Sequence, residues 1–455
     1  MLKIFNSILS GGKKIGIDKS IAYSSGARII QTFTGIILLF FIARYLTKAE
    51  QGFYYTFGSI VAIQVFFELG LTNIITQYVA HEASHLKWKD TTTLEGEEKN
   101  HSRLAHLLRF SVRWYAIISG IFFIVLLGVG IWFFGYYSTP LEDETVSWFI
   151  PWCLVSIGAS IHLFISPLMA TIQGLNRVKD VMKMRFYQQL IIPFTTLIGL
   201  MIGWHLYVVG IASILSAIYV FVYASCTDLK LIIVKLWRKE ITEKIIYKKE
   251  IFPYQWKIAL SWLSGYFIFQ LFNPVLFATH GAVVAGQMGM TIQVLNAINA
   301  FSMSWISTKI PVFSGLIAQE EYKKLDKIFN TTVKQMSAVC VMLLGIMILG
   351  VSTLRWLDIP LGYRFLPYWP MIFMSLALFL NQYVGAWATY LRCHKKEPYL
   401  WLSVVTGLAC TGSTIVLGKF YGAFGMSAGY CFIVILSVFL AYSIYTKCKI
   451  SWHSI

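Results

Sequence analysis

Long runs of apolar residues, separated by short polar and charged breaks, make up most of the chain. Each run is about 20 residues long, the length that an α-helix needs to cross the hydrocarbon core of a bilayer. The pattern predicts about twelve spans, six in each half of the chain. They lie near residues 21–46, 52–79, 114–137, 147–170, 182–204 and 206–226, and near 256–279, 283–311, 335–354, 366–391, 398–417 and 421–446.

The composition favours a polytopic, all-α membrane protein over a soluble enzyme. Of 455 residues, 57% are hydrophobic and only 13% are charged, whereas soluble domains carry about 25% charged residues. The net charge of +17 does not indicate nucleic-acid binding, because the basic residues lie in short loops and not on one water-facing surface. Basic loops instead suit an anionic membrane face or an anionic substrate.

The distribution of lysine and arginine predicts the orientation, because cytoplasmic loops are enriched in both residues. With the N-terminus placed inside, 32 of the 38 basic residues fall on the cytoplasmic side. Arg28 lies within the first span, and the five that fall outside are Arg44, Lys48, Arg355, Arg364 and Lys419. Both termini are therefore predicted to be cytoplasmic.

The largest basic loop divides the spans six and six, which prompts a search for an internal repeat. Gly52, which opens the second span, corresponds to Ala285-Gly286 in the eighth, and two further weak matches fall at equivalent places in each half. We predict an N-terminal six-helix lobe over 1–227, a basic cytoplasmic linker over 228–257 and a C-terminal six-helix lobe over 258–455. Transporters built from two such bundles bind substrate between them, near the midplane, and alternate access.

Charged residues inside the spans are few and therefore informative, because each costs at least about 2.5 to 3.5 kcal/mol on insertion scales. Glu68 is the one acidic residue well inside a span, and Gln64 shares its helix face. Arg28 is the clearest basic residue. We interpret Glu68 as a candidate coupling site for a proton or cation, and Arg28 as a candidate anchor for an anionic headgroup. The competing interpretation is a structural Arg28–Glu68 ion pair, or an Arg28 that reaches to the helix end.

Neutral polar side chains dominate the spans of the second half. Gln293, Asn296 and Asn299 recur every third residue and form one polar stripe, and Asn273 lies in the preceding span. Interhelical hydrogen bonds explain single amides, whereas a stripe that faces a sugar-sized cavity explains several together. Lys257 opens the seventh span, where it either sets the topology or attracts a phosphate. Further amides in these spans are Gln270, Asn381 and Gln382.

The segment His81-Glu82-Ala83-Ser84-His85 matches HExxH, in which two histidines one helical turn apart bind zinc and the glutamate acts as a base. A catalytic zinc also needs a third protein ligand, and neither His101, His106 nor the rest of the chain shows the context of a known protease class. We interpret the segment as the polar end of a helix that continues from the second span. We predict no catalytic residues, no metal and no cofactor.

Several degenerate patterns occur in order along the spans. They are Ala43-Arg44-Tyr45-Leu46, Gln51-Gly52-Phe53-Tyr54-Tyr55, Glu68-Leu69-Gly70-Leu71, the stretch His101 to Tyr115, and Gln173-Gly174-Leu175-Asn176-Arg177. With them the chain resembles the polysaccharide and O-antigen flippases (Wzx-like) of the multidrug/oligosaccharidyl-lipid/polysaccharide (MOP) transporter superfamily.

The resemblance implies a MATE-like, V-shaped pair of six-helix lobes in a bacterial cytoplasmic (inner) membrane. Such a protein flips an undecaprenyl-diphosphate-linked oligosaccharide by alternating access, with plausible ion-gradient coupling, and its partners include a polysaccharide polymerase and a chain-length regulator. The family's cationic central cavity has one clear counterpart within the spans of this sequence, Arg28.

Two alternatives stay open. A cation-coupled multidrug exporter of the same superfamily usually carries more acidic residues within its spans than the single Glu68 here. The other is a membrane-embedded enzyme such as a glycosyltransferase, polymerase or protease. Large external loops with catalytic acids would favour a polymerase, and the longest external loops here have only about a dozen residues.

Overall fold

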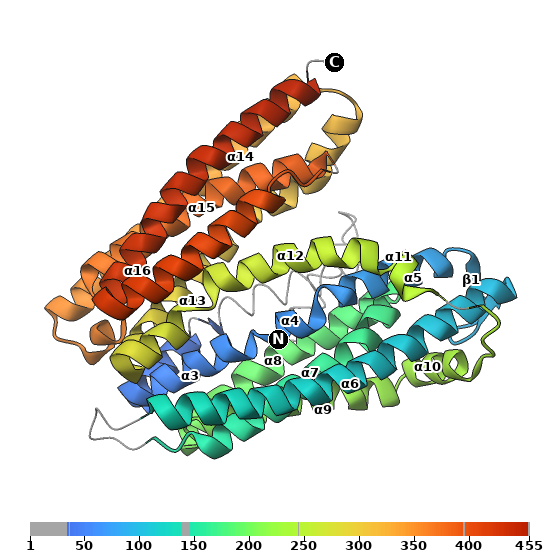
Figure 1. Cartoon of the computed structure of the whole chain (residues 1–455), viewed down its shortest axis with the longest axis horizontal. Coiled ribbons are helices and arrows are strands. Elements are labelled where there is room, and N and C mark those ends of the chain that lie inside the picture. Colours follow the sequence, from blue (N-terminus) through green and yellow to red (C-terminus); the bar gives the residue numbers. More distant parts are fainter. Residues whose placement is uncertain (1–33, 36, 139–145, 244, 395, 454–455) are drawn as a thin grey trace, which may run out of the picture. The chain divides into compact units, whose positions relative to one another are not determined.

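The computed structural model describes residues 34–35, 37–138, 146–243, 245–394 and 396–453 (Figure 1). This part of the chain is built almost entirely of α-helices, with one antiparallel hairpin of β1 (Leu86–Trp88) and β2 (Leu94–Gly96). Within these ranges, seven helices are long and apolar enough to cross a membrane, and a bent helix pair raises this number to eight. The structure thus confirms a mostly helical chain with several candidate membrane spans. The count of about twelve spans and the cytoplasmic location of the termini stay predictions.

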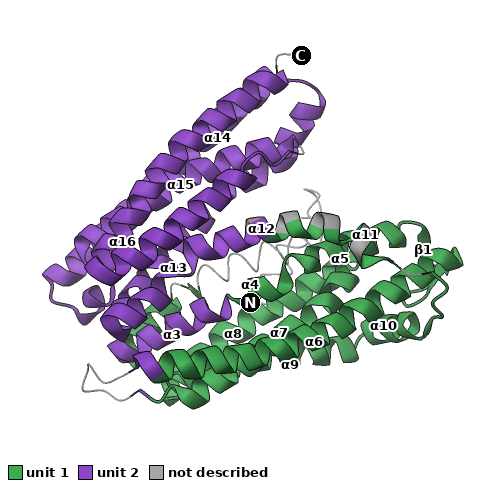
Figure 2. Ribbon diagram, viewed as in Figure 1, with its two compact units in different colours: residues 1–45, 63–135, 147–259 green, residues 46–62, 136–146, 260–455 purple. Residues whose placement is uncertain are grey.

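The chain forms two compact units (Figure 2). Unit 1 holds residues 1–45, 63–135 and 147–259, and unit 2 holds residues 46–62, 136–146 and 260–455. The segments 46–62 and 136–146, which belong to the predicted N-terminal lobe, group with unit 2, and the predicted linker 228–257 groups with unit 1. The boundaries of the compact units therefore differ from those of the predicted lobes.

Unit 1 is a bundle centred on α7, which packs on α5, α8 and α9. Trp152 of α7 is fully buried, and its indole Nε1 donates to the Leu126 carbonyl at 3.0 Å, which joins α7 to α6. Residues 37–45 form a further helical stretch, which carries no label in Figure 1. The labelled helices of unit 1 are α4 (Gln64–Glu68), α5 (Leu71–Ala83), α6 (Glu98–Tyr137), α7 (Phe149–Gly174), α8 (Val178–Ile202), α9 (Tyr207–Ser225), α10 (Leu229–Arg238) and α11 (Tyr247–Glu250).

Unit 2 is organised around α13, which packs on α3, α14, α15 and α16. The chain passes from unit 1 into unit 2 along α12 (Phe252–Phe269). The other elements of unit 2 are α3 (Lys48–Val61), α13 (Phe272–Ala318), α14 (Tyr322–Trp356), the short 3₁₀ helix η2 (Pro360–Arg364), α15 (Tyr368–Cys393) and α16 (Leu400–His453).

Two of these long helices contain a single non-helical glycine. Gly281 in α13 has φ 86° and ψ 173°, and Gly422 in α16 has φ 59° and ψ −144°. Glycine adopts positive φ without the steric cost that a Cβ atom brings. Gly281 lies at the predicted junction between the seventh and eighth spans, and Gly422 lies just inside the start of the predicted twelfth span. Each of these helices therefore covers parts of two predicted spans.

The segment 46–62 belongs to unit 2 because α3 lies very close to α13. A Cβ atom on Gly52 would lie 1.9 Å from the Ala282 carbonyl oxygen, and one on Gly286 would lie 2.9 Å from the Gly52 nitrogen. Small residues allow such a close approach of membrane helices. The buried Gln51 side chain adds a hydrogen bond from Nε2 to the Gly286 carbonyl at 2.9 Å. Gly52 and Gly286, matched as repeat positions in the sequence, are therefore in direct contact.

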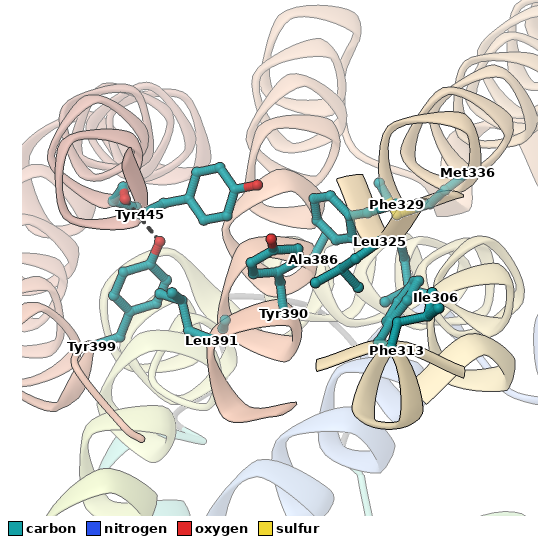
Figure 3. Close-up of a cluster of buried hydrophobic side chains, with 13 residues drawn as sticks. Ile306, Phe313, Leu325, Phe329, Met336, Ala386, Tyr390, Leu391, Tyr399 and Tyr445 are labelled. Atoms are coloured by element: carbon teal, nitrogen blue, oxygen red, sulfur yellow. Dashed lines mark hydrogen bonds between the residues drawn. The ribbon is translucent and has the colours of Figure 1, made fainter. Parts of the chain in front are cut away.

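A cluster of buried apolar and aromatic side chains joins α13 to α16 (Figure 3). The Phe329 ring packs edge-on against Phe313 and Tyr390, with centroid separations of 5.7 and 4.7 Å. The Tyr399 hydroxyl donates to the Ala441 carbonyl at 2.7 Å. This cluster holds together the start of α14, the end of α15 and the end of α16, where Asp326 pairs with Lys449.

Candidate functional site

Glu68 is the last residue of α4, at a break in the predicted second span. Leu69 (φ 46°) and Gly70 (φ 70°) both have left-handed backbone conformations and end the helix. The helical stretch Lys48–Glu68 then bends by 44° into α5. A helix that ends inside a span leaves carbonyl groups without helical partners. In transporters, interrupted helices of this kind provide carbonyl oxygens that coordinate cations.

The surroundings of Glu68 are aromatic and weakly polar. Tyr115 of α6 is 1% exposed, interacts electrostatically with Glu68 and shares a 2.9 Å hydrogen bond with Thr72. The Phe67 ring packs on Phe122 at 5.0 Å. Within the described ranges, Glu68 forms no ion pair. A half-buried carboxylate at the negative end of a helix favours a proton or a cation as its partner.

Gln64 opens α4 and lies one helical turn before Glu68, as the sequence predicts. Its side chain is half-buried. The structure thus places an amide and a carboxylate on the same short helix, directly before the break. This is the local geometry on which an ion-coupling role for Glu68 depends.

In unit 2, the predicted polar residues divide into two kinds. Asn273 is 6% exposed, and its Nδ2 donates to the Ser59 hydroxyl of α3 at 3.0 Å. Asn273 therefore forms an interhelical hydrogen bond, which is the structural alternative to a side chain that faces a sugar-sized cavity. By contrast, Gln293, Asn296 and Asn299 lie together on α13 after the Gly281 break, and Asn296 is exposed. These three side chains make no hydrogen bond to any residue that the structure describes.

The structure does not test the two residues that were predicted to bind an anionic headgroup. Arg28 lies outside the described residues. Lys257 lies in α12, and its role stays a prediction.

The HExxH segment has a structural partner that the sequence did not identify. Glu82 is 4% exposed and accepts a 2.8 Å hydrogen bond from Arg103 Nε. Arg103 Nη2 also donates to Glu250 at 2.7 Å. Glu82 is therefore held in a buried ion pair and is not poised as a base. Among the described residues, no three His, Cys, Asp or Glu side chains are grouped to hold a metal ion.

Two arginines that the sequence placed on the external side bind backbone carbonyls. Arg355 donates to the carbonyls of Gly362, Phe365 and Leu366 and lies over the Tyr368 ring at 4.7 Å. Arg364 donates to the Leu46 carbonyl at 2.7 Å. Arg355 and Arg364, which do not follow the enrichment of basic residues in predicted cytoplasmic loops, therefore stabilise the chain around η2. No sequence spacing marks them, because their partners are carbonyl groups, which every residue carries.

Comparison with solved structures identifies the fold. An inward-facing multidrug resistance MATE family transporter of the MOP superfamily matches with a TM-score of 0.60 and 11% identity, over 91% of this chain and 98% of that one. The MATE multidrug transporter DinF-BH, solved as a complex, matches with a TM-score of 0.54 and 10% identity, over 94% and 95%. A MOP superfamily transporter from Pyrococcus furiosus, described with a binding pocket of reverse polarity and a different function, matches with a TM-score of 0.50 and 13% identity, over 96% and 97%.

No protein-family model matches the chain. No curated protein matches it in sequence. Identities of 10–13% establish a shared fold and no more. The chain has the fold of MATE transporters.

Proposed function

We propose that this protein is an alternating-access transporter that flips an undecaprenyl-diphosphate-linked oligosaccharide, such as an O-antigen repeat unit, across a bacterial cytoplasmic membrane. The observation that carries this proposal is the stripe of Gln293, Asn296 and Asn299, which have no hydrogen-bond partner in the described part of a MATE-type fold. Amide groups both donate and accept, which suits sugar hydroxyl groups. Polar side chains inside membrane segments mark substrate paths more often than lipid-facing surfaces.

The substrate's diphosphate would bind the cationic residues Arg28 and Lys257, and Glu68 would couple transport to a proton or cation gradient. Protonation or cation binding at Glu68 removes a charge from the membrane region and so favours a different helix arrangement. A polysaccharide polymerase and a chain-length regulator would act on the flipped product.

A cation-coupled multidrug exporter is the second candidate. It is favoured by the Glu68 carboxylate, which has no cationic partner in the described part and would attract a cationic drug. One structural neighbour, DinF-BH, is itself a multidrug transporter, which supports this alternative. The MATE fold alone is compatible with both candidates.

Deletion of the gene in a strain without paralogues separates the two candidates. A flippase predicts loss of surface polysaccharide and accumulation of lipid-linked repeat units inside the cell. An exporter predicts sensitivity to cationic drugs with normal surface polymer, and that result would overturn the flippase proposal.

Variants of the stripe test the observation itself. In the same strain, Gln293→Leu combined with Asn296→Leu should abolish complementation without loss of protein from the membrane. Gln335→Leu, which removes an exposed amide of α14, is the matched control and should complement fully. Glu68→Gln and Arg28→Ala should each lower transport more than expression. Full complementation by both would leave these two residues with structural roles only.

A further inference from the structure

A pocket of about 320 Å³ at one end of unit 1 gathers basic side chains. We call it the hairpin pocket, because the turn between β1 and β2 forms one wall and α10 forms another. Apolar groups of Leu94, Ile232 and Leu236 contribute to its lining. The polar residues that line it are Thr92, Thr93, His101, Lys235, Arg238 and Lys239.

The walls of the hairpin pocket are held in place by hydrogen bonds. Lys235 Nζ donates to the hydroxyls of Thr92 at 2.8 Å and Thr93 at 2.6 Å. An ammonium group has three N–H donors, so one remains for a ligand. On the other side, Arg109 of α6 donates to the Trp237 carbonyl at 2.8 Å and to the Lys239 carbonyl. The pocket is thus formed before a ligand binds.

The cations of the hairpin pocket have no carboxylate partner among the described residues. Within the described residues, Lys235, Arg238 and Lys239 appear in no ion pair, although acidic residues lie in the neighbouring segments. Glu95 pairs with Lys89, and Glu243 lies 3.6 Å from Lys99. Asp90 accepts the backbone N–H groups of Thr92 and Thr93, both at 2.6 Å, and shapes the turn. The lining of the pocket holds three cations and no carboxylate, although Glu98 lies within electrostatic range of His101.

His101 lies in the wall of the hairpin pocket and is only 6% exposed. Its Nδ1 atom has no hydrogen-bond partner in the described part of the chain, and it is covered from solvent. Lys239 and Glu98 both lie within electrostatic range of this imidazole. The cations, and not this covered atom, therefore present the ligand-binding groups of the pocket.

We propose that the hairpin pocket binds a phosphoryl group, with Lys235, Arg238 and Lys239 neutralising its charge and the remaining N–H of Lys235 donating to it. This site is separate from the residues of the proposed transport path and does not depend on the proposed substrate. Leu231 and Trp237 of α10 are 52% and 36% exposed beside these cations. Exposed apolar and cationic residues on one amphipathic helix are typical of a membrane interface, which favours the headgroup of an anionic phospholipid over a soluble phosphate.

Thermal unfolding of the purified full-length protein in detergent tests the site. The probes are phosphatidylglycerol, phosphatidylcholine and inorganic phosphate, each added alone. We expect phosphatidylglycerol to raise the unfolding midpoint and phosphatidylcholine to leave it unchanged. Lys239→Gln, which breaks no hydrogen bond in the structure, should weaken phosphatidylglycerol binding about tenfold, and Lys235→Gln with Lys239→Gln should abolish the shift.

A matched control carries the same charge change elsewhere on unit 1. Lys230→Gln with Lys179→Gln removes two exposed lysines that do not line the pocket, and it should keep the full shift. An equal loss in both double variants would mean non-specific attraction and would overturn the proposal, as would no shift with either phosphate-bearing probe. A shift with inorganic phosphate that is lost only in the pocket variants would support the phosphoryl site and identify a soluble ligand as its source.

Discussion

The two units use opposite charges at corresponding places. In unit 1, Arg103 lies near the start of α6, between Glu82 and Glu250 at 2.8 and 2.7 Å. In unit 2, Asp326 lies near the start of α14, where it binds Lys449 at 2.8 Å and accepts the Tyr390 hydroxyl at 2.9 Å. The first cluster has a cation at its centre and the second has an anion.

The helices around these centres are similar in both halves. Each of α6 and α14 is a long helix that extends well beyond its predicted span, and α7 and α15 that follow them both have 26 residues. The correspondence of helix lengths therefore does not extend to the signs of the charges. Backbone geometry follows from apolar periodicity, which tolerates many sequences, whereas each ion pair needs particular partners.

Unit 2 also surrounds its charge with rings. Tyr322 stacks on His453 with centroids 4.0 Å apart, and His394 Nε2 lies 3.2 Å from His453 Nε2. Two imidazoles this close cannot both be in the positively charged, doubly protonated form without strong repulsion. The end of unit 1 joins three charged side chains, whereas the end of unit 2 combines one ion pair with a stacked ring and two adjacent histidines.

Replacement of the central cation should have the largest effect. Arg103→Leu leaves Glu82, whose side chain is 5% exposed, as an uncompensated buried charge and should destabilise the protein by about 3 kcal/mol. Thermal unfolding in detergent measures this loss. Arg103→Leu with Glu82→Leu removes both charges and should recover much of it. A double variant as unstable as the single one would show that the ion pair is not the cause.

The glycine contact in unit 2 should come next. Gly286→Ala places a Cβ atom 2.9 Å from the backbone nitrogen of Gly52, and backbone atoms cannot move aside as a flexible side chain does. Overpacking of this kind should cost about 2 kcal/mol. Gly345→Ala in α14 is the matched control, since nothing lies within 4 Å of its added Cβ. Equal stability of the two variants in the same unfolding assay would contradict the close approach of α3 and α13.

Asp326→Asn should have a smaller effect than Arg103→Leu, about 1 kcal/mol, because the asparagine oxygen still accepts the Tyr390 hydroxyl and only the partly exposed Lys449 pair is lost. The same unfolding assay measures it. A loss as large as that of Arg103→Leu would mean that unit 2 relies on its ion pair as much as unit 1 does. That result would remove the contrast between the two ends.

Acidification should separate the two ends with the smallest free-energy change. Burial lowers the pKa of His394 below its ordinary value of 6.5. The unfolded chain then binds more protons than the folded one, so this contribution to stability is present above about pH 6.5 and is lost as the pH falls below it. Burial alone would raise the pKa of Glu250, but the Ile246 N–H and Arg103 outweigh it and lower the pKa below 4.5. The unit 1 contribution is therefore lost only as the pH falls below about 4.5.

Hydrogen exchange at pH 7.5 and pH 5.5 measures this difference. Protection should fall in peptides from residues 318–330 and 390–399 and persist in those from 80–106. Burial also lowers the pKa of His453, so His394→Gln with His453→Gln should remove the pH dependence of the unit 2 peptides. Equal loss of protection at both ends would rule out the histidines as its origin.

The apolar pattern predicts helix positions well because burial in lipid acts on every residue of a span. The helices α6, α7, α9, α14 and α15 each contain a predicted span or nearly all of one. The grouping of α3 with unit 2 was not predictable, because Gln51 and its partner Gly286 are 235 residues apart. Sequence periodicity identifies the apolar face of a helix, but it does not identify the distant helix against which that face packs.

The candidate sites were predictable to different degrees. The adjacent Leu69 and Gly70 could have indicated the helix break after Glu68, because a glycine inside an apolar run lowers helix propensity. The hairpin pocket could not be predicted. In the sequence, Lys235 and Lys239 are two of the basic residues that set the topology, and His101 begins a stretch that carries the family resemblance and does not complete a zinc site. Their juxtaposition depends on a hairpin turn and on Arg109, which is 130 residues from Lys239.

The position of α3 also constrains the order in which the protein can be assembled during synthesis. The hydrogen bond from Gln51 to Gly286 closes a loop of 235 residues, and that from Arg364 to Leu46 closes one of 318. The ribosome therefore makes α3 early, but its partners are made only with the second half of the chain. Until then its polar Gln51 side chain and its Gly52 face lack the contacts that cover them in the finished fold. A nascent chain released before residue 260 would keep that surface open, and an early stop would leave a membrane fragment prone to mispairing.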